Sequence, residues 1–342
     1  MGGNCPGERS RFSAGLALAT ITPLVLAPLL APSDGRGTNE VLGVLVVVAY
    51  AGHLAVTGLL WRVPEVQQAV RTRPGRLVAV PVALVVAASV VAFVASDRLL
   101  AWLLIGYFAW QFSHFQRQNL GLAAIVTAQW DSEPLRRSER RLVIFAGWCG
   151  SAALLAHPAL LDGLIPSLPP SLAGPVVRVA ALGLAGCAIG TVVIACHSKR
   201  PALLVATNLA AVLFFLPVFA FKSTAAAVTG MVVAHGLQYL WAVGWRRHPS
   251  RPRQNGSGRE LSGRHVALAI TGFAVVGGAL LSAMSELHGA HAAGLRLLYG
   301  AYLGIAMAHF AVDSVIWRRV RPSPQAWARL RALLPSSAHG GL

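Results

Sequence analysis

The stretch from Tyr299 to Arg318 reads YGAYLGIAMAHFAVDSVIWR and is typical of the whole chain. Apart from His309, Asp313 and one serine, its side chains are apolar or aromatic until Trp317 and Arg318 close it. A helix of about 20 such residues spans the hydrocarbon core of a bilayer and satisfies its own backbone there. Because tryptophan and arginine are common anchors at a membrane surface, the stretch predicts a membrane-spanning helix.

Similar apolar runs fill the 342-residue chain. Hydrophobic residues make up 55% of it and charged residues 12%, against about 25% charged in an ordinary soluble domain. A soluble fold cannot bury that much apolar surface, whereas lipid can cover it. The chain is therefore predicted to be an all-α, polytopic transmembrane helical bundle of about ten helices. The seventh and eighth runs nearly touch at Lys222, which leaves a nine-helix or re-entrant arrangement open. The runs are residues 12–32, 40–61, 77–96, 99–127, 142–161, 175–196, 201–221, 223–245, 266–285 and 294–317.

The basic residues set the expected orientation of these helices. Arginine and lysine cluster after the second, fourth, sixth, eighth and tenth runs, whereas the loops between hold few of them. Short basic loops stay on the cytoplasmic side, so an even number of helices places both the N- and C-termini inside. The same loops account for the net charge of +17, and no nucleic acid is expected as a partner. Abundant alanine, arginine and glycine are typical of a GC-rich bacterial genome, which points to the bacterial cytoplasmic (inner) membrane.

No segment outside the apolar runs is long enough to form a soluble domain. Residues 1–321 form the predicted integral membrane domain, and residues 322–342 form a cytoplasmic tail. Residues 246–264, rich in glycine, proline and arginine, form a flexible cytoplasmic linker within that domain. The first run is longer than the apolar part of a secretory signal, so it is expected to remain as the first helix, with cleavage as the minor alternative. Any chemistry is therefore expected inside the bundle.

Four of the eleven histidines interrupt apolar runs, on the second, fourth, eighth and tenth predicted helices. These helices all cross the membrane in the same direction. His53 and His309 each lie nine residues before an arginine and His235 lies eleven before one, which puts them within about 3 Å of one depth. Neutral imidazole is the commonest metal ligand in proteins. The pattern predicts one metal centre held by His53, His114, His235 and His309.

Polar residues follow these histidines by about one turn, on the same helix face. Gln118, Gln238 and Asp313 each lie three or four residues beyond a candidate ligand, which suits them to orient the histidine rings. Arg117 needs an anionic partner inside a membrane, and either Asp313 or an anionic group of a substrate would serve. Arg117, Asp313, Gln118 and Gln238 are therefore the candidate catalytic residues beside the metal.

Histidine ligands without an accompanying cysteine suit Fe, Cu, Zn or Ni, and Fe(II) is the first expectation. Two of the histidines could instead hold haem b in an electron-transfer protein. Four histidines gathered from several membrane helices resemble the site of the Brp/Blh-type carotenoid-cleaving dioxygenases, which are polytopic membrane proteins with a histidine-ligated iron. The resemblance lies in the constellation of these four positions and implies an iron-dependent oxygenase. The histidine boxes of membrane desaturases, HxxxH and HxxHH, are absent.

The function expected on these grounds is that of a membrane-embedded non-haem iron oxygenase or oxidoreductase, acting on a lipophilic small molecule that enters from the bilayer. Two other classes stay open. A proton-coupled transporter also uses buried histidine, arginine and aspartate. A structural or assembly protein uses polar clusters to hold its helices together. No P-loop, GxSxG elbow, HExxH motif or GxGxxG after a strand supports nucleotide-driven or hydrolytic chemistry.

Overall fold

The structure is a computed structural model that describes residues 6–30, 71–130, 133–156, 168–221, 223–245 and 292–319, with a few positions between them. Ala49, His53 and Leu54 are among those positions. Every regular element in the described part of the chain is a helix, so the predicted all-α class is confirmed there. The elements are α1 (Pro6–Leu29), η2 (Gly75–Ala79), α5 (Val80–Val94), α6 (Asp97–Gln129), α7 (Arg137–Ala156), α8 (Pro170–Ser198), α9 (Ala202–Val212), η3 (Leu213–Phe215), α10 (Leu216–Ala220), α11 (Thr224–Trp245) and α13 (Ala293–Arg319).

Eight of the ten predicted apolar runs coincide with helices in these ranges. The runs at 40–61 and 266–285, the linker at 246–264 and the tail at 322–342 lie wholly or mostly outside the described residues. The seventh and eighth runs are separate helices, because Phe221 is extended between the end of α10 and the start of α11. Five described helices are long and apolar enough to cross a membrane: Arg9–Leu29, Gly75–Val94, Ser171–Ser198, Ala202–Ala220 and Gly294–Val315.

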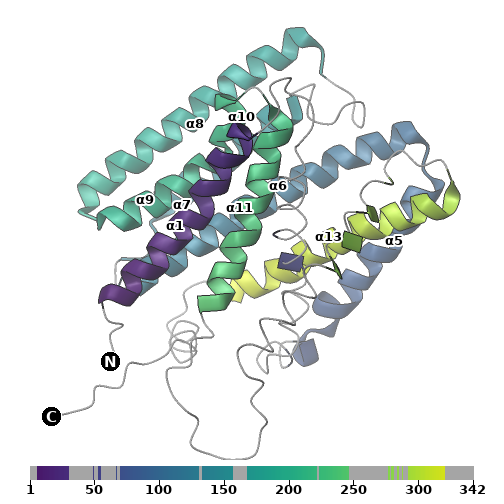
Figure 1. Cartoon of the computed structure of the whole chain (residues 1–342), viewed down its shortest axis with the longest axis horizontal. Coiled ribbons are helices and arrows are strands. Elements are labelled where there is room, and N and C mark those ends of the chain that lie inside the picture. Colours follow the sequence, from purple (N-terminus) through teal and green to yellow (C-terminus); the bar gives the residue numbers. More distant parts are fainter. Residues whose placement is uncertain are drawn as a thin grey trace, which may run out of the picture.

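The helices pack largely as long pairs. α13 lies along α5, α8 lies along α7, and α1 lies along α11 (Figure 1). The α5–α13 pair is close because Gly300 and Gly304 of α13 face the α5 backbone. A β-carbon at Gly304 would lie 2.5 Å from Cα of Val85. Glycines at such a contact let two membrane helices approach to backbone distance.

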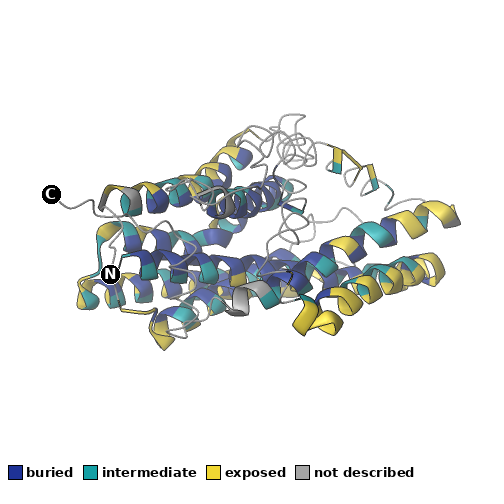
Figure 2. Ribbon diagram, turned by 90° about the horizontal axis from the view of Figure 1, so that it is seen from below, coloured by how far each residue is buried: buried dark blue, intermediate teal, exposed yellow. Residues whose placement is uncertain are grey.

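Helix α6 joins these pairs and forms the core of the bundle. It contacts α7, α9 and α13, and its apolar side chains enter three separate hydrophobic clusters. Buried residues gather where the helices face one another (Figure 2). The middle of α6 is different, because its buried side chains are mostly polar: Gln111, His114, Gln116, Gln118 and Asn119. Polar groups inside a membrane bundle need partners there, so this segment is where a site is expected.

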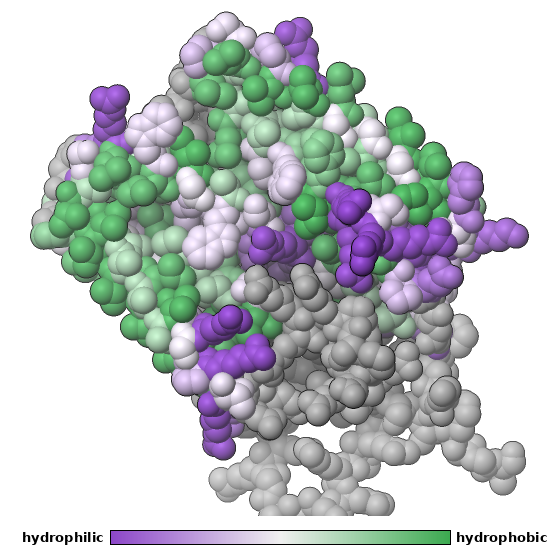
Figure 3. All heavy atoms as spheres, turned by 180° about the vertical axis from the view of Figure 1, so that it is seen from behind, coloured by the Kyte–Doolittle hydropathy of each residue, from purple (hydrophilic) through white to green (hydrophobic). Residues whose placement is uncertain are grey.

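The outer faces of the bundle are apolar. On α8, the side chains of Val179, Leu182 and Ile189 are 69%, 75% and 65% exposed, and α5 exposes a similar row of valines. In the view of Figure 3, most of the surface of the described residues is apolar, and the hydrophilic residues gather in a band across the middle of the view and at a few outer tips. Contiguous apolar surface of this extent is unfavourable in water but suits contact with lipid tails. The described helices therefore fit a lipid bilayer environment.

Candidate metal centre

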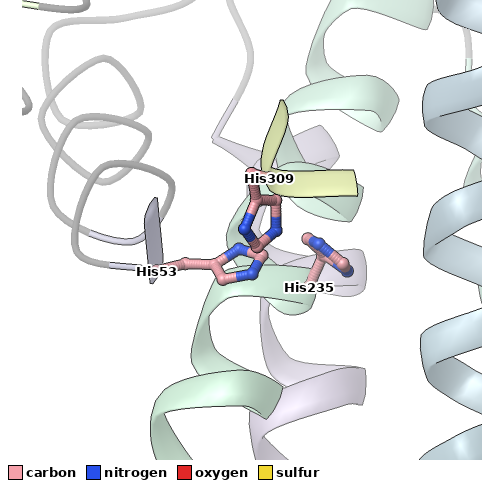
Figure 4. A group of neighbouring side chains, drawn as sticks. All are labelled: His53, His235 and His309. Atoms are coloured by element: carbon pink, nitrogen blue, oxygen red, sulfur yellow. The ribbon is translucent and has the colours of Figure 1, made fainter. Parts of the chain in front are cut away.

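The four predicted histidines come together inside the bundle. His114 lies on α6, His235 on α11 and His309 on α13, and each is buried. His53 is fully buried as well and points its ring toward those of His235 and His309 (Figure 4). The ring centroid of His53 lies 4.2 Å from that of His309 and 4.6 Å from that of His235. His114 lies 5.0 Å from His235 and 5.3 Å from His309 by the same measure.

A buried carboxylate completes this cluster. Asp313 has no solvent exposure, and its Oδ2 atom lies 3.5 Å from Nε2 of His309. The same oxygen is 3.8 Å from Nε2 of His114 and 4.0 Å from Nε2 of His53. Two overlapping sets of ligand atoms result, each with all members within 4.8 Å of one another: His53, His235 and His309, and His114, His309 and Asp313. Because His309 belongs to both sets, the five residues form one cluster.

A glycine brings the chain around His53 into contact with α11. Gly236, directly after His235, faces the main chain at Ala49, and a β-carbon on it would lie 2.3 Å from the Ala49 carbonyl oxygen. Any larger residue would push the two segments apart. Ala49 lies four residues before His53, so this contact brings the two histidines together. The sequence analysis did not identify Gly236, because its requirement depends on a partner segment far away in the chain.

Aromatic rings enclose the histidines. Phe115 packs on His235 with ring centroids 4.3 Å apart, and Phe310 stacks on His114 at 4.6 Å. Tyr239 is buried and lies 4.4 Å from His53. These rings hold the imidazoles in place and keep the surroundings of the cluster apolar. Tyr239 was not among the predicted site residues, although it lies one helical turn beyond a candidate ligand.

The hydrogen bonds of Gln118 and Gln238 go to a main-chain carbonyl and to other polar side chains, and none goes to a histidine ring. Nε2 of Gln118 donates to the main-chain carbonyl of His235 at 2.9 Å and to Oε1 of Gln238 at 3.2 Å. Gln238 donates to Oδ1 of Asn119 at 2.8 Å and to a hydroxyl group on α1 at 2.9 Å. The network continues through Asn119 to Gln116, which donates to carbonyl groups of α7 and α9. It joins five helices beside the cluster and holds α6 against α11.

Arg117 does not pair with Asp313, which was one of its two predicted partners. Its side chain is exposed, whereas Asp313 is fully buried, and no ion pair forms between these two described residues. Asp313 instead lies among the histidines. The reason is geometric: Arg117 is three residues beyond His114, and this offset of about 60° around α6 turns it from the cluster toward the surface.

The cluster has the donor atoms and the size of a metal site. Nε2 of His114 and both ring nitrogens of His235 are buried without a hydrogen-bond partner in the described part of the chain. Orphaned polar atoms in an apolar interior are costly, and a metal ion would satisfy them. With metal–nitrogen bonds of about 2.1 Å, imidazoles on neighbouring coordination positions have centroids roughly 4.5–5 Å apart. The four observed separations, 4.2, 4.6, 5.0 and 5.3 Å, lie within about 0.3 Å of this range.

One pair of rings is too close to hold a haem between them. A bis-histidine haem lies between its two axial imidazoles, which face each other across the macrocycle. The rings of His53 and His309 are nearly perpendicular and 4.2 Å apart, which leaves no space between them for a porphyrin.

Comparison with known proteins identifies no relative, because no protein family, curated protein or solved structure matches the chain.

Proposed function

We propose that the chain is a membrane-embedded metalloprotein that binds one transition metal ion at His53, His114, His235, His309 and Asp313, and that it acts as a non-haem iron oxygenase or oxidoreductase on a lipophilic substrate. One observation carries the proposal: four buried imidazoles and one buried carboxylate, from elements far apart in the sequence, converge within ligand distance of one another. A cluster that only held helices together would be expected to use its polar atoms in hydrogen bonds. Here, Nε2 of His114 and both ring nitrogens of His235 are buried and make no hydrogen bond to the described residues.

The donor set favours Fe(II). His114, His309 and Asp313 make up two histidines and one carboxylate, the combination found in non-haem Fe(II) oxygenases. Nitrogen and oxygen ligands without a thiolate also suit zinc. The donor atoms favour iron, and the metal analysis described below distinguishes iron from zinc. Bound Fe(II) would supply a centre at which dioxygen is activated against a lipophilic molecule.

The chain's own residues would then prepare the site for that chemistry. Asp313 supplies negative charge next to three imidazoles and balances the charge of a divalent ion in an apolar interior. Phe115, Phe310 and Tyr239 keep the histidine rings in place and exclude water. The Gln118–Gln238 pair holds the main chain at His235 against α6 and so fixes the position of this ligand.

The membrane arrangement that accompanies this function has ten helices with both termini on the cytoplasmic side. Its support is the alternation of basic loops in the sequence together with the apolar helices of the described region. The bacterial inner membrane is the proposed location. A lipophilic substrate would reach the cluster sideways from the bilayer, because the outer faces of the helices contact lipid.

Metal analysis of matched histidine variants tests the proposal. Wild-type protein, H235A and H114A would be purified in mild detergent under anaerobic, iron-replete conditions, and bound metals counted by mass spectrometry. His197 is exposed on α8, so H197A is the control. We expect about one equivalent of iron in wild type and H197A and almost none in H235A or H114A. Size-exclusion chromatography checks that each variant stays folded.

Two results would overturn the proposal. Full iron stoichiometry in folded H235A and H114A would show that the ion binds elsewhere. Wild-type protein without any metal would end the metal-centre hypothesis and favour a proton-coupled transporter, since a buried aspartate beside imidazoles also suits a proton relay. Zinc in place of iron would keep the site and refute the oxygenase assignment.

A further inference from the structure

Arg117 is a cation beside the cluster with no acidic partner in the described part of the chain. It lies one helical turn beyond His114 on α6 and is exposed. All four carboxylates whose side chains the structure describes already lie next to other basic groups, in the pairs Asp97–Arg296, Glu133–Arg136 and Glu139–Arg200 and in the histidine cluster of Asp313.

The stretch of α6 from Leu103 to Trp110, on the same side of the helix as Arg117, is apolar and open. Leu103 and Trp110 on this face are 45% and 38% exposed, and a β-carbon on Gly106 between them would meet nothing within 4 Å. Residues 103, 106, 110 and 117 follow one side of an α-helix. At 1.5 Å per residue, the track from Leu103 to Arg117 is about 21 Å long, a length that a long acyl chain covers.

We propose that this face of α6 binds an amphiphile with an anionic head group, with the carboxylate or phosphate on Arg117 and the hydrocarbon tail along Gly106 and Trp110. The guanidinium group forms paired hydrogen bonds with planar or tetrahedral anions, which lysine cannot reproduce. An unpaired arginine on a membrane helix is unfavourable, and an anionic head group at this position offsets that cost. The proposal rests on the proposed function, because it assigns the substrate class of the same metal centre.

The position of Arg117 also predicts where on the substrate the reaction occurs. His114 is buried one turn away from the head-group position, while the tail track leads toward the opposite end of α6. Along the helix axis, carbons close to the head group are therefore nearest to His114, and the end of the tail is far from it. The products are expected to be modified near the carboxylate or phosphate.

Binding of spin-labelled lipids tests the contact directly. Spin-labelled stearic acid and phosphatidic acid, with the methyl ester and phosphatidylcholine as uncharged or neutral counterparts, would be added to the full-length protein in nanodiscs. The immobilised part of the electron paramagnetic resonance spectrum measures binding. The variants are R117Q, R117K and the control R98Q, since Arg98 is exposed at the other end of the same helix.

We expect wild type and R98Q to bind at least one anionic lipid about tenfold more tightly than its neutral counterpart, and R117Q to lose this preference. R117K should keep only part of it. Whether stearate or phosphatidic acid is preferred identifies the head group. An unchanged preference in R117Q, or no preference in wild type, would overturn the proposal. Metal is counted in the same samples: metal-free wild type refutes the metal centre, while the comparison of R117Q with R98Q alone decides the anion contact.

Discussion

Replacing Asp313 by asparagine separates a metal ligand set from a merely structural cluster. The change keeps the shape of the side chain and removes one negative charge from the centre of the histidines. The Oδ2 atom lies 3.5–4.0 Å from three imidazole nitrogens and is shielded from solvent, so a bound cation loses an unscreened carboxylate. Loss of a group that ligates or supports a bound metal lowers affinity by about 10–100-fold.

This affinity change has a measurable effect on stability. A metal ion present at 100 times its dissociation constant stabilises the wild-type fold by about 2.7 kcal/mol. At the same concentration, a variant with 100-fold weaker affinity gains only about 0.4 kcal/mol. D313N should therefore lose most of the metal-dependent rise in thermal midpoint that wild type shows.

The assay is a thermal-unfolding series in detergent, with Fe(II) added under anaerobic conditions to metal-stripped protein. D97N is the control, because Asp97 is 76% exposed and lies outside the cluster. The reasoning would be refuted if D313N and wild type showed equal metal-dependent stabilisation. The reasoning would also be refuted if D97N lost as much of the metal-dependent stabilisation as D313N.

Two further predictions concern the framework that holds the site, and both are measured as free energies of unfolding in mixed micelles. E139Q should cost about 3–5 kcal/mol, because the Glu139–Arg200 pair is buried at 2.8 Å and its loss leaves an uncompensated cation. E133Q, in an exposed pair, should cost under about 1 kcal/mol, and equal losses in the two variants would contradict this account. G304A should cost about 1–3 kcal/mol, because its methyl group meets the backbone of α5 at 2.5 Å. G106A should instead be neutral or stabilising by up to about 1 kcal/mol, since that position is open, so a stable G304A would show that α5 and α13 are not in close contact.

The candidate ligands were predictable because intramembrane histidines are rare and their depth follows from counting residues. Each apolar run has a length set by the bilayer, and an arginine at its inner end provides a fixed reference. Counting from that reference puts His53, His235 and His309 at similar depth, and the structure brings all three together with His114.

The partner of Arg117 was not predictable in the same way. Depth along a helix can be counted from the sequence, but the rotation of the helix about its axis depends on what packs against it. Arg117 and His114 differ by about 60° around α6, and that difference places one at the surface and the other in the cluster. Likewise, the sequence shows that Gln118 and Gln238 are polar and near ligands, but not that they bind each other and a carbonyl group.

By itself, the sequence determined that the chain is helical, that its helices suit a membrane, and which four histidines lie inside it. Apolar length, basic loops and the rarity of buried imidazole are local properties that need no knowledge of packing. Only the tertiary structure decided that Asp313 belongs among the histidines and that Arg117 does not. The physical reason is that convergence depends on helix rotation and on close backbone contacts such as that of Gly236 with Ala49, which involve residues far apart in the chain.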